Sequence, residues 1–267
     1  MKAAQVFALM ATYCLLYSSL AIRQGITALP KQTTVRSPGD VRLQLLNGPA
    51  TERAALAAEL GLVIPRWKRW RATKDIGCDV FDSAQVTYAA LQPTSSDALL
   101  QIYSRNCEYA YVVVFEREPE GYWTHIDTVS LWSKDSEPEI SLESLVEEGT
   151  KEVVVRHCAT DYGTGVSQTS MMIFKLFRTG MHLIFNQPER VTYAVPAGPK
   201  LSQSIEQSQQ SDFEFIAPSA DEPRSSEKQI LEKQVVQDRN ATITRRWLYI
   251  WVPEIKSFQA VLSLGSA

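Results

Sequence analysis

Residues 109–115 read YAYVVVF, and this stretch decides the fold. Its seven apolar or aromatic residues, three of them valine, are too few to span a bilayer, and they leave neither face of a strand polar. A continuous apolar run of this length is typical of a strand that is buried on both faces. The sequence therefore predicts a central strand with a packed layer on each side.

Further strand-like runs lie on both sides of this stretch, separated by turn residues such as Pro119, Gly163 and Gly180. They read LLQIY at 99–103, GYWTHIDTVSLW at 121–132, EVVVRH at 152–157, SMMIFKLF at 170–177 and MHLIF at 181–185. The runs QILEKQVV, ATITRRWLYIWV and SFQAVLSL continue the pattern near the C-terminus. The predicted fold is mainly β, a twisted antiparallel sheet or an open sandwich.

Composition divides the 267 residues into five predicted segments. They are a signal peptide at 1–21, a basic helical arm at 22–74, a β body at 75–196, a polar loop or insertion at 197–228, and C-terminal strands that complete the β body at 229–267. The polar segment is rich in Ser, Gln, Pro and Glu, which predicts a long loop with one candidate strand, FEFI at 213–216. Residues 135–148 hold six carboxylates and predict a short exposed helix or turn.

The N-terminus has the pattern of a secretory signal. Lys2 precedes a largely apolar stretch at 6–17, and Ser19-Leu20-Ala21 has small residues at the two positions that a signal peptidase reads. We expect a secreted or periplasmic protein, cleaved after Ala21. The alternative is an N-terminal membrane anchor, because residues 3–21 almost reach the length of about 20 residues that a spanning helix needs.

Three cysteines follow the signal segment: Cys78, Cys107 and Cys158. In an oxidising compartment two of them can pair. Cys78 precedes the run QVTYAAL and Cys107 lies in the predicted hairpin turn SRNCEY, so both are at strand ends. We predict a disulfide between Cys78 and Cys107. The alternative is three free thiols, partly buried as small hydrophobic side chains.

Two short helices are predicted within the arm. Asp40 is the expected N-cap of VRLQLL, which ends at Asn47-Gly48, and ERAALAAEL forms a second helix that ends at Gly61. Their expected apolar contacts are leucines three and four residues apart, namely Leu43, Leu46, Leu56 and Leu60. Such an αα-hairpin is too small to fold alone, so we expect it to pack on the sheet or to act as a docking arm.

Charge is unevenly distributed along the chain. Residues 22–74 carry ten Lys or Arg against three Asp or Glu, a net of +7, whereas residues 75–267 carry a net of −11. The cluster PRWKRWRATK at 65–74 supplies four candidate binding residues for a glycan or an anionic surface: Arg66, Trp67, Arg69 and Trp70. Alternatively, the tryptophans cover a sheet edge while the cations face water. The acidic β body argues against a nucleic-acid partner, which needs concentrated Lys and Arg.

Two segments of the body can be aligned with each other. Residues 111–132 and 152–177 match at an offset of 41, and each contains a valine-rich strand, a Gly-containing loop and a second strand. They resemble the FG-GAP and VCBS-type β-repeat modules of secreted bacterial proteins over about 75 residues. That resemblance implies two propeller-like blade units, although two units cannot close a propeller. It does not extend to the calcium loop of those modules, since residues 157–165 offer only Asp161 as a carboxylate.

Signatures of common enzymes are absent from the sequence: it has no GxSxG, HExxH, P-loop or GxGxxG motif. Trp123, His125 and Asp127 alternate along one predicted strand, which would place all three on one face, where they could bind a sugar or support acid–base chemistry. The alternative is a polar row at a sheet rim. No two of the three histidines have metal-ligand spacing, so we expect no metal and no cofactor.

These patterns favour a secreted or periplasmic, non-enzymatic binding or structural module, with Trp123 and the basic cluster as its binding residues. An envelope protein, a glycan or an anionic surface is the expected partner. The alternative is a cell-envelope hydrolase or sugar-active enzyme that uses His125 and Asp127. An enzyme would bring His125 and a carboxylate together in a concave pocket, whereas a module would present a flat surface or an edge.

Overall fold

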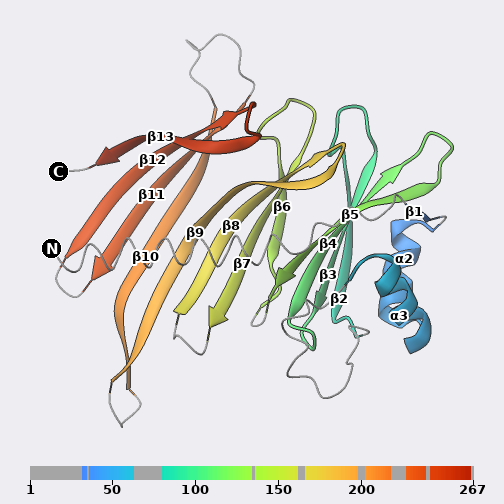
Figure 1. Cartoon of the computed structure of the whole chain (residues 1–267), viewed down its shortest axis with the longest axis horizontal. Helices are drawn as coiled ribbons and strands as arrows, with labels where there is room; N and C mark the ends of the chain where they lie inside the picture. Colours follow the sequence, from blue (N-terminus) through green and yellow to red (C-terminus); the bar gives the residue numbers. More distant parts are fainter. Residues whose placement is uncertain are drawn as a thin grey trace.

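The computed structural model describes residues 32–34, 36–62, 80–133, 136–161, 166–197, 202–217, 227–238 and 241–265. These residues form two antiparallel β-sheets, one of five strands and one of eight, together with two short N-terminal helices (Figure 1). The mainly β prediction is confirmed, including the small αα-hairpin. No helix within the described ranges is long and apolar enough to cross a membrane.

Sheet A has the strand order β1-β5-β4-β3-β2. Its strands are β1 (Gln32–Thr34), β2 (Ser83–Ala89), β3 (Asp97–Ser104), β4 (Tyr109–Arg117) and β5 (Trp123–Trp132). Strand β4 contains the YAYVVVF stretch, and all seven of these residues are buried. The prediction of a central strand packed on both faces is therefore confirmed.

Sheet B follows in sequence and has the order β13-β12-β11-β10-β9-β8-β7-β6. Its strands are β6 (Glu139–Glu143), β7 (Glu152–Asp161), β8 (Val166–Phe177), β9 (Gly180–Ala197), β10 (Ser202–Ile216), β11 (Gln229–Asp238), β12 (Thr242–Val252) and β13 (Ser257–Gly265). Each strand pairs with its neighbour in sequence, so the sheet is a continuous meander. The C-terminal strands lie at the end of the molecule away from the helices (Figure 1).

The two helices, α2 (Pro38–Asn47) and α3 (Ala50–Glu59), pack against one face of sheet A. Helix α2 begins one turn earlier than predicted, because Ser37 is its N-cap and accepts a hydrogen bond from the Asp40 backbone N–H. Pro38 suits the first helical position, where no N–H partner is needed, and Asp40 lies in the first turn, where the helix dipole favours a carboxylate. The prediction of Asp40 as the N-cap was wrong.

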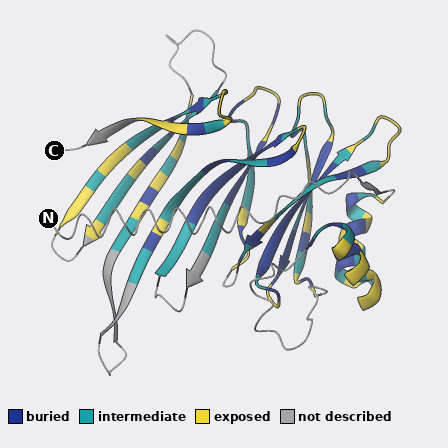
Figure 2. Cartoon of the chain, in the orientation of Figure 1, coloured by how far each residue is buried: buried dark blue, intermediate teal, exposed yellow. Residues whose placement is uncertain are grey.

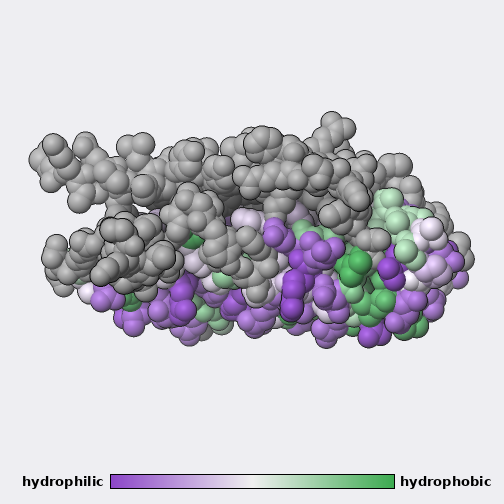
Figure 3. Space-filling model, turned by 90° about the horizontal axis from the view of Figure 1, so that it is seen from below, coloured by the Kyte–Doolittle hydropathy of each residue, from purple (hydrophilic) through white to green (hydrophobic). Residues whose placement is uncertain are grey.

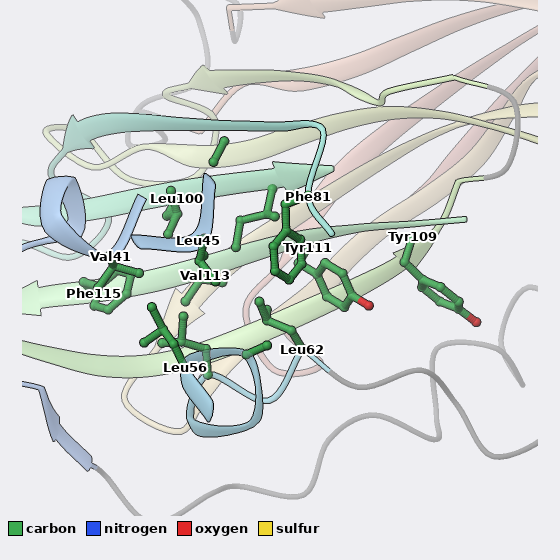
Figure 4. Packing of buried hydrophobic residues seen from close by; sticks show 14 of the residues in the cluster. Val41, Leu45, Leu56, Leu62, Phe81, Leu100, Tyr109, Tyr111, Val113 and Phe115 are labelled. Atoms are coloured by element: carbon green, nitrogen blue, oxygen red, sulfur yellow. The ribbon is translucent and has the colours of Figure 1, made fainter. Parts of the chain in front are cut away.

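Alternating residues of β4 divide the core into layers. Tyr111, Val113 and Phe115 face the helices, whereas Val112 and Val114 face sheet B. In Figure 4, Val41 and Leu45 of α2 and Leu56 of α3 lie over the helix-side residues of sheet A. Of the leucines predicted to make this contact, Leu56 and Leu60 are buried and Leu46 is partly buried, whereas Leu43 is 53% exposed. Helix α2 buries Val41 and Leu45, four positions apart, together with Pro38.

The C-terminal strands of sheet B curl so that β13 approaches β9. The Ser257 hydroxyl of β13 donates to the Ile184 carbonyl of β9 at 3.0 Å, and Phe185 makes edge-on contacts with Phe213, Tyr249 and Phe258. Burial is densest in sheet A and in β7 and β8, and the C-terminal strands are more exposed (Figure 2). The aromatic contacts of Phe185 with Phe213, Tyr249 and Phe258 belong to a further hydrophobic cluster, which packs the C-terminal strands of sheet B.

Two segments predicted as loop or helix are strands. Strand β10 spans 202–216: its last part, FEFI at 213–216, was predicted as a strand, but residues 202–212 were predicted as polar loop. Residues 139–143 form β6 rather than a helix or turn. Composition misled both predictions. Strand β10 is paired on both sides, with β9 and with β11, so backbone hydrogen bonds can hold a Ser- and Gln-rich strand in place.

Candidate functional site on the helix side and free edge of sheet A

Several predicted site residues lie outside the described residues, so their assignments stay predictions. These are the signal segment 1–21, the disulfide partner Cys78 and the basic-cluster residues Arg66, Trp67, Arg69 and Trp70. Cys107, in the turn between β3 and β4, is buried in the core cluster that also contains residues of the helices. Cys158, in β7, is a free thiol.

A β-bulge in β5 separates the residues that the sequence placed on one face. Phe115 pairs with His125 but the preceding residue, Val114, pairs with Asp127, so Ile126 is the extra residue of β5. Trp123 and His125 therefore face the helices, whereas Asp127 faces sheet B. The prediction that the three side chains share a face was wrong, because the bulge interrupts the two-residue period.

His125 links β5 to the end of α3. It is only 6% exposed, and its Nε2 lies 2.9 Å from the Thr128 Oγ1, whose hydroxyl donates to the Leu60 carbonyl at 2.7 Å. The hydroxyl has a single proton, so His125 Nε2 donates to Thr128 in this arrangement. Burial lowers the pKa of His125, although nearby Asp127 and Glu59 oppose that shift. The buried imidazole is thus connected through Thr128 to the residue that follows α3.

Asp127 links the two sheets. Its Oδ2 accepts the Met181 backbone N–H of β9 at 2.7 Å, and its Oδ1 accepts the Thr128 N–H at 2.8 Å. Gly180 makes this approach feasible, because a Cβ there would lie 2.5 Å from the carboxylate and the backbone φ is +116°. Asp127 thus caps the β8–β9 turn from sheet A, on the opposite face of β5 from His125.

An exposed aromatic pair lies on the helix side of sheet A. The ring centroids of Tyr88 in β2 and Trp123 in β5 are 5.8 Å apart, and the rings are tilted by 49°. Tyr88 is 60% exposed, whereas Trp123 is half-buried against the core below the helices. Trp123 was a predicted binding residue; Tyr88 was missed, although its alternation with Ala84 and Val86 places it on the same face of β2.

An open groove of about 250 Å³ lies between α2 and β2. Gly39, Arg42, Ala84, Gln85 and Val86 line it, and the Arg42 Nε donates to the Ala84 carbonyl at 2.7 Å. Pockets for small molecules usually measure about 300–1,000 Å³ and enclose the ligand. This space, called the edge groove below, is better suited to a single side chain.

The surface seen from below is hydrophilic over most of its described area (Figure 3). Hydrophobic residues gather toward the end of the molecule that carries sheet A and the helices (Figure 3). Large apolar side chains that are exposed at this end include Leu43, Val80 and Tyr88. This end of the molecule therefore offers exposed apolar side chains to a partner, although Ile243, Ile255 and Val261 are exposed at the far end of sheet B as well.

Buried charges elsewhere serve the packing of sheet B. The Lys175 Nζ lies 2.8 Å from the Glu152 Oε1, and the carboxylate of Glu232 accepts hydrogen bonds from the hydroxyls of Ser211 and Tyr249 at 2.6 and 2.7 Å. Burial, followed by Glu232, raises the pKa of Tyr249 well above its ordinary value. Within the described ranges, no three His, Cys, Asp or Glu side chains could together hold a metal ion.

Comparison with protein-family models, with curated proteins and with solved structures gave no match. The two segments that resemble FG-GAP and VCBS-type modules form the hairpins β4–β5 and β7–β8, which belong to different sheets. The likeness to those modules stays a prediction.

Proposed function

We propose that this protein is a non-enzymatic binding module that acts outside the cytoplasm and presents the helix-side surface of sheet A to its ligand. The observation that carries the proposal is the pairing of Tyr88 with Trp123. Aromatic rings give a large contact area with few rotatable bonds, and a ring left exposed in a folded protein is a frequent contact point for ligands. The Tyr88 ring is 60% exposed and is held by its neighbour.

The enzymatic alternative needs His125 and Asp127 to act on one substrate. His125 is buried beneath α3, and Asp127 lies on the opposite face of β5, bonded to the backbone of β9. Each side chain already has partners that hold the fold together. Their positions favour a structural use of both residues and give no support to a shared acid–base role.

A glycan is the ligand class that we expect. Flat aromatic rings fit the apolar faces of sugar rings, and the net charge of −11 over residues 75–267 disfavours an anionic surface as the partner of the β body. The alternative ligand is an envelope protein that contacts Tyr88 and Trp123 through apolar side chains, and an array on which no glycan binds would favour it.

The test is to screen the purified protein against a glycan array and to measure any hit by calorimetry for the natural sequence and for Tyr88→Ala and Trp123→Ala. Losing one ring contact is worth about 0.5–1.5 kcal/mol, so affinity should fall up to about tenfold in each variant. Tyr122→Ala is the matched control, because Tyr122 is 37% exposed but precedes the strand. Equal binding by both variants and the control would remove the aromatic pair from the proposal.

Export and disulfide formation are parts of the same proposal. N-terminal sequencing of protein from its native host should begin at Ile22, and a sequence that begins at Met1 would contradict cleavage. A Cys78–Cys107 bond would leave Cys158 as the single free thiol of the mature protein. Thiol titration of the denatured, unreduced protein should find one thiol per chain; three would eliminate the disulfide.

A further inference from the structure

Strand β2 is the last strand of sheet A in the part of the chain that the structure describes. The direction of its backbone groups follows from its neighbours. The Arg117 N–H bonds to the Ser96 carbonyl, so even-numbered residues of β3 bond to β4 and odd-numbered residues bond to β2. Their partners in β2 are Ser83, Gln85, Thr87 and Ala89. Hence Ala84, Val86 and Tyr88 point their N–H and C=O groups away from the sheet.

The Arg42 contact agrees with this assignment, because Arg42 reaches the Ala84 carbonyl from α2. Natural edge strands are commonly protected by charged residues, by proline, by being short or by a covering helix or loop, and α2 makes one such contact here through Arg42. Strand β2 reads SAQVTYA and has seven residues with no charge and no proline. By contrast β6, an edge of sheet B, reads EISLE, with two glutamates in five residues. The β2 edge therefore retains the features of a strand that pairs.

We propose that β2 pairs antiparallel with β2 of a second copy of this chain, about a two-fold axis that passes beside Val86. Such an interface is self-complementary: each residue meets the residue equally far from the axis on the other copy. Val86 faces Val86, Ala84 faces Tyr88 and Gln85 faces Thr87 of the second copy. The outward groups of Ala84, Val86 and Tyr88 supply the hydrogen bonds.

The edge groove favours this register. It lies beside Ala84 and Val86 on the helix side, the face on which Tyr88 also lies. Since Ala84 and Tyr88 are equally far from Val86, the two-fold axis places each Tyr88 over the groove of the other copy. The exposed ring is covered, and the Arg42 guanidinium comes within reach of a ring face, where a cation is attracted. The Ala84 carbonyl has a second lone pair, so it can keep Arg42 while it accepts a new N–H.

Charge and area set the strength of the pairing. Two uncharged strands meet without repulsion, which favours a second copy over a charged peptide. Five paired residues bury far less than the roughly 1,200–2,000 Å² of a stable interface, so association should be weak, with a Kd of about 10–100 µM. The pairing requires no ligand, so its failure would leave the proposed binding function untouched; because the pairing covers Tyr88, ligand binding must be measured well below the expected Kd, where the protein is monomeric.

The experiment is sedimentation equilibrium of the purified protein over about 1–300 µM, which brackets the expected Kd. We expect a monomer–dimer equilibrium. Amide hydrogen exchange by NMR then locates the interface: the Val86 and Tyr88 amides should become protected as the concentration rises, whereas the Gln85 and Thr87 amides, already bonded to β3, should not change. A protein that stays monomeric throughout, or dimerises without protecting Val86 and Tyr88, would overturn the proposal.

Variants at the axis provide the control. Val86→Pro removes an outward N–H without breaking a bond to β3, and Val86→Lys places like charges against each other; each should raise Kd by more than tenfold. Val86→Thr keeps the branched shape and the N–H, so it should dimerise nearly as well as the natural sequence. Because Val86→Pro can also disturb the strand, circular dichroism must show that its fold is unchanged. Val86→Lys tests the same interface independently, without proline. Undiminished dimerisation in folded Val86→Lys protein would contradict the two-fold pairing.

Discussion

Replacing Lys175 by Met tests whether the buried ion pair holds sheet B together. Lys175 is 6% exposed and Glu152 is fully buried, with Nζ and Oε1 2.8 Å apart. The other oxygen of Glu152 accepts the N–H groups of Leu145 and Val146 at 2.8 and 3.3 Å, so this carboxylate also fixes the chain between β6 and β7. Removing one partner of a buried pair costs about 3–5 kcal/mol, because the other charge stays buried without compensation. We expect a loss near the lower end of this range, because the Leu145 and Val146 amides still donate hydrogen bonds to Glu152.

The assay is urea unfolding followed by circular dichroism for Lys175→Met, for the double variant Lys175→Met with Glu152→Gln, and for Lys151→Met. The double variant should regain part of the loss, because it contains no unpaired charge. Lys151 is exposed and lies at the start of β7, so its replacement should change the free energy of unfolding by less than about 0.5 kcal/mol. If Lys175→Met cost as little as the Lys151 control, the ion pair would not be what stabilises this part of sheet B.

Three further predictions concern single contacts. Gly180→Ala should lower the free energy of unfolding by about 2–4 kcal/mol, because a Cβ meets the Asp127 carboxylate and the positive φ is strained; a loss below about 1 kcal/mol would argue against the tie between the sheets. Ser37→Ala should cost about 0.5–2 kcal/mol by removing the cap of α2, and Ser37→Asp should restore it; the melting temperatures decide this. Burial lowers the pKa of His125 and of His157, so the unfolded chain binds protons more readily than the folded protein. The free energy of unfolding should therefore be constant above about pH 6.5 and decrease below it. A urea midpoint that does not fall between pH 7 and pH 5 would contradict this.

The sheet architecture could be predicted because its signal is carried by many residues together. Val112, Val113 and Val114 are apolar in succession, and only a strand packed on both sides buries all three. The helical hairpin was predictable from its Gly and Pro boundaries. Its cap was not, because Ser37 and Asp40 both suit an N-cap and the geometry of Pro38 decides between them.

The site could not be predicted in the same way, because single residues determine it. The extra residue Ile126 moves Asp127 to the other face of β5. No periodic pattern in the sequence predicts such a bulge. Tyr88 becomes important only because β2 is the last strand of sheet A among the described residues, which depends on strand order. Residues 202–212 of β10 were missed because their stability as a strand comes from pairing with β9 and β11 and not from their own composition.

The claim that His125 stabilises the fold and does not catalyse a reaction is tested most directly by ¹⁵N NMR of its imidazole across a pH titration. The structure predicts a neutral ring near pH 7, protonated at Nε2 through its bond to Thr128, with a pKa below the ordinary value of about 6.5. Thr128→Val should disturb this signal, and Asp127→Asn should lower the pKa of His125 modestly, because Asp127 partly opposes the effect of burial. A His125 that titrates at or above the ordinary value, and whose pKa falls strongly in Asp127→Asn, would contradict the structural assignment and return the two residues to a shared acid–base site.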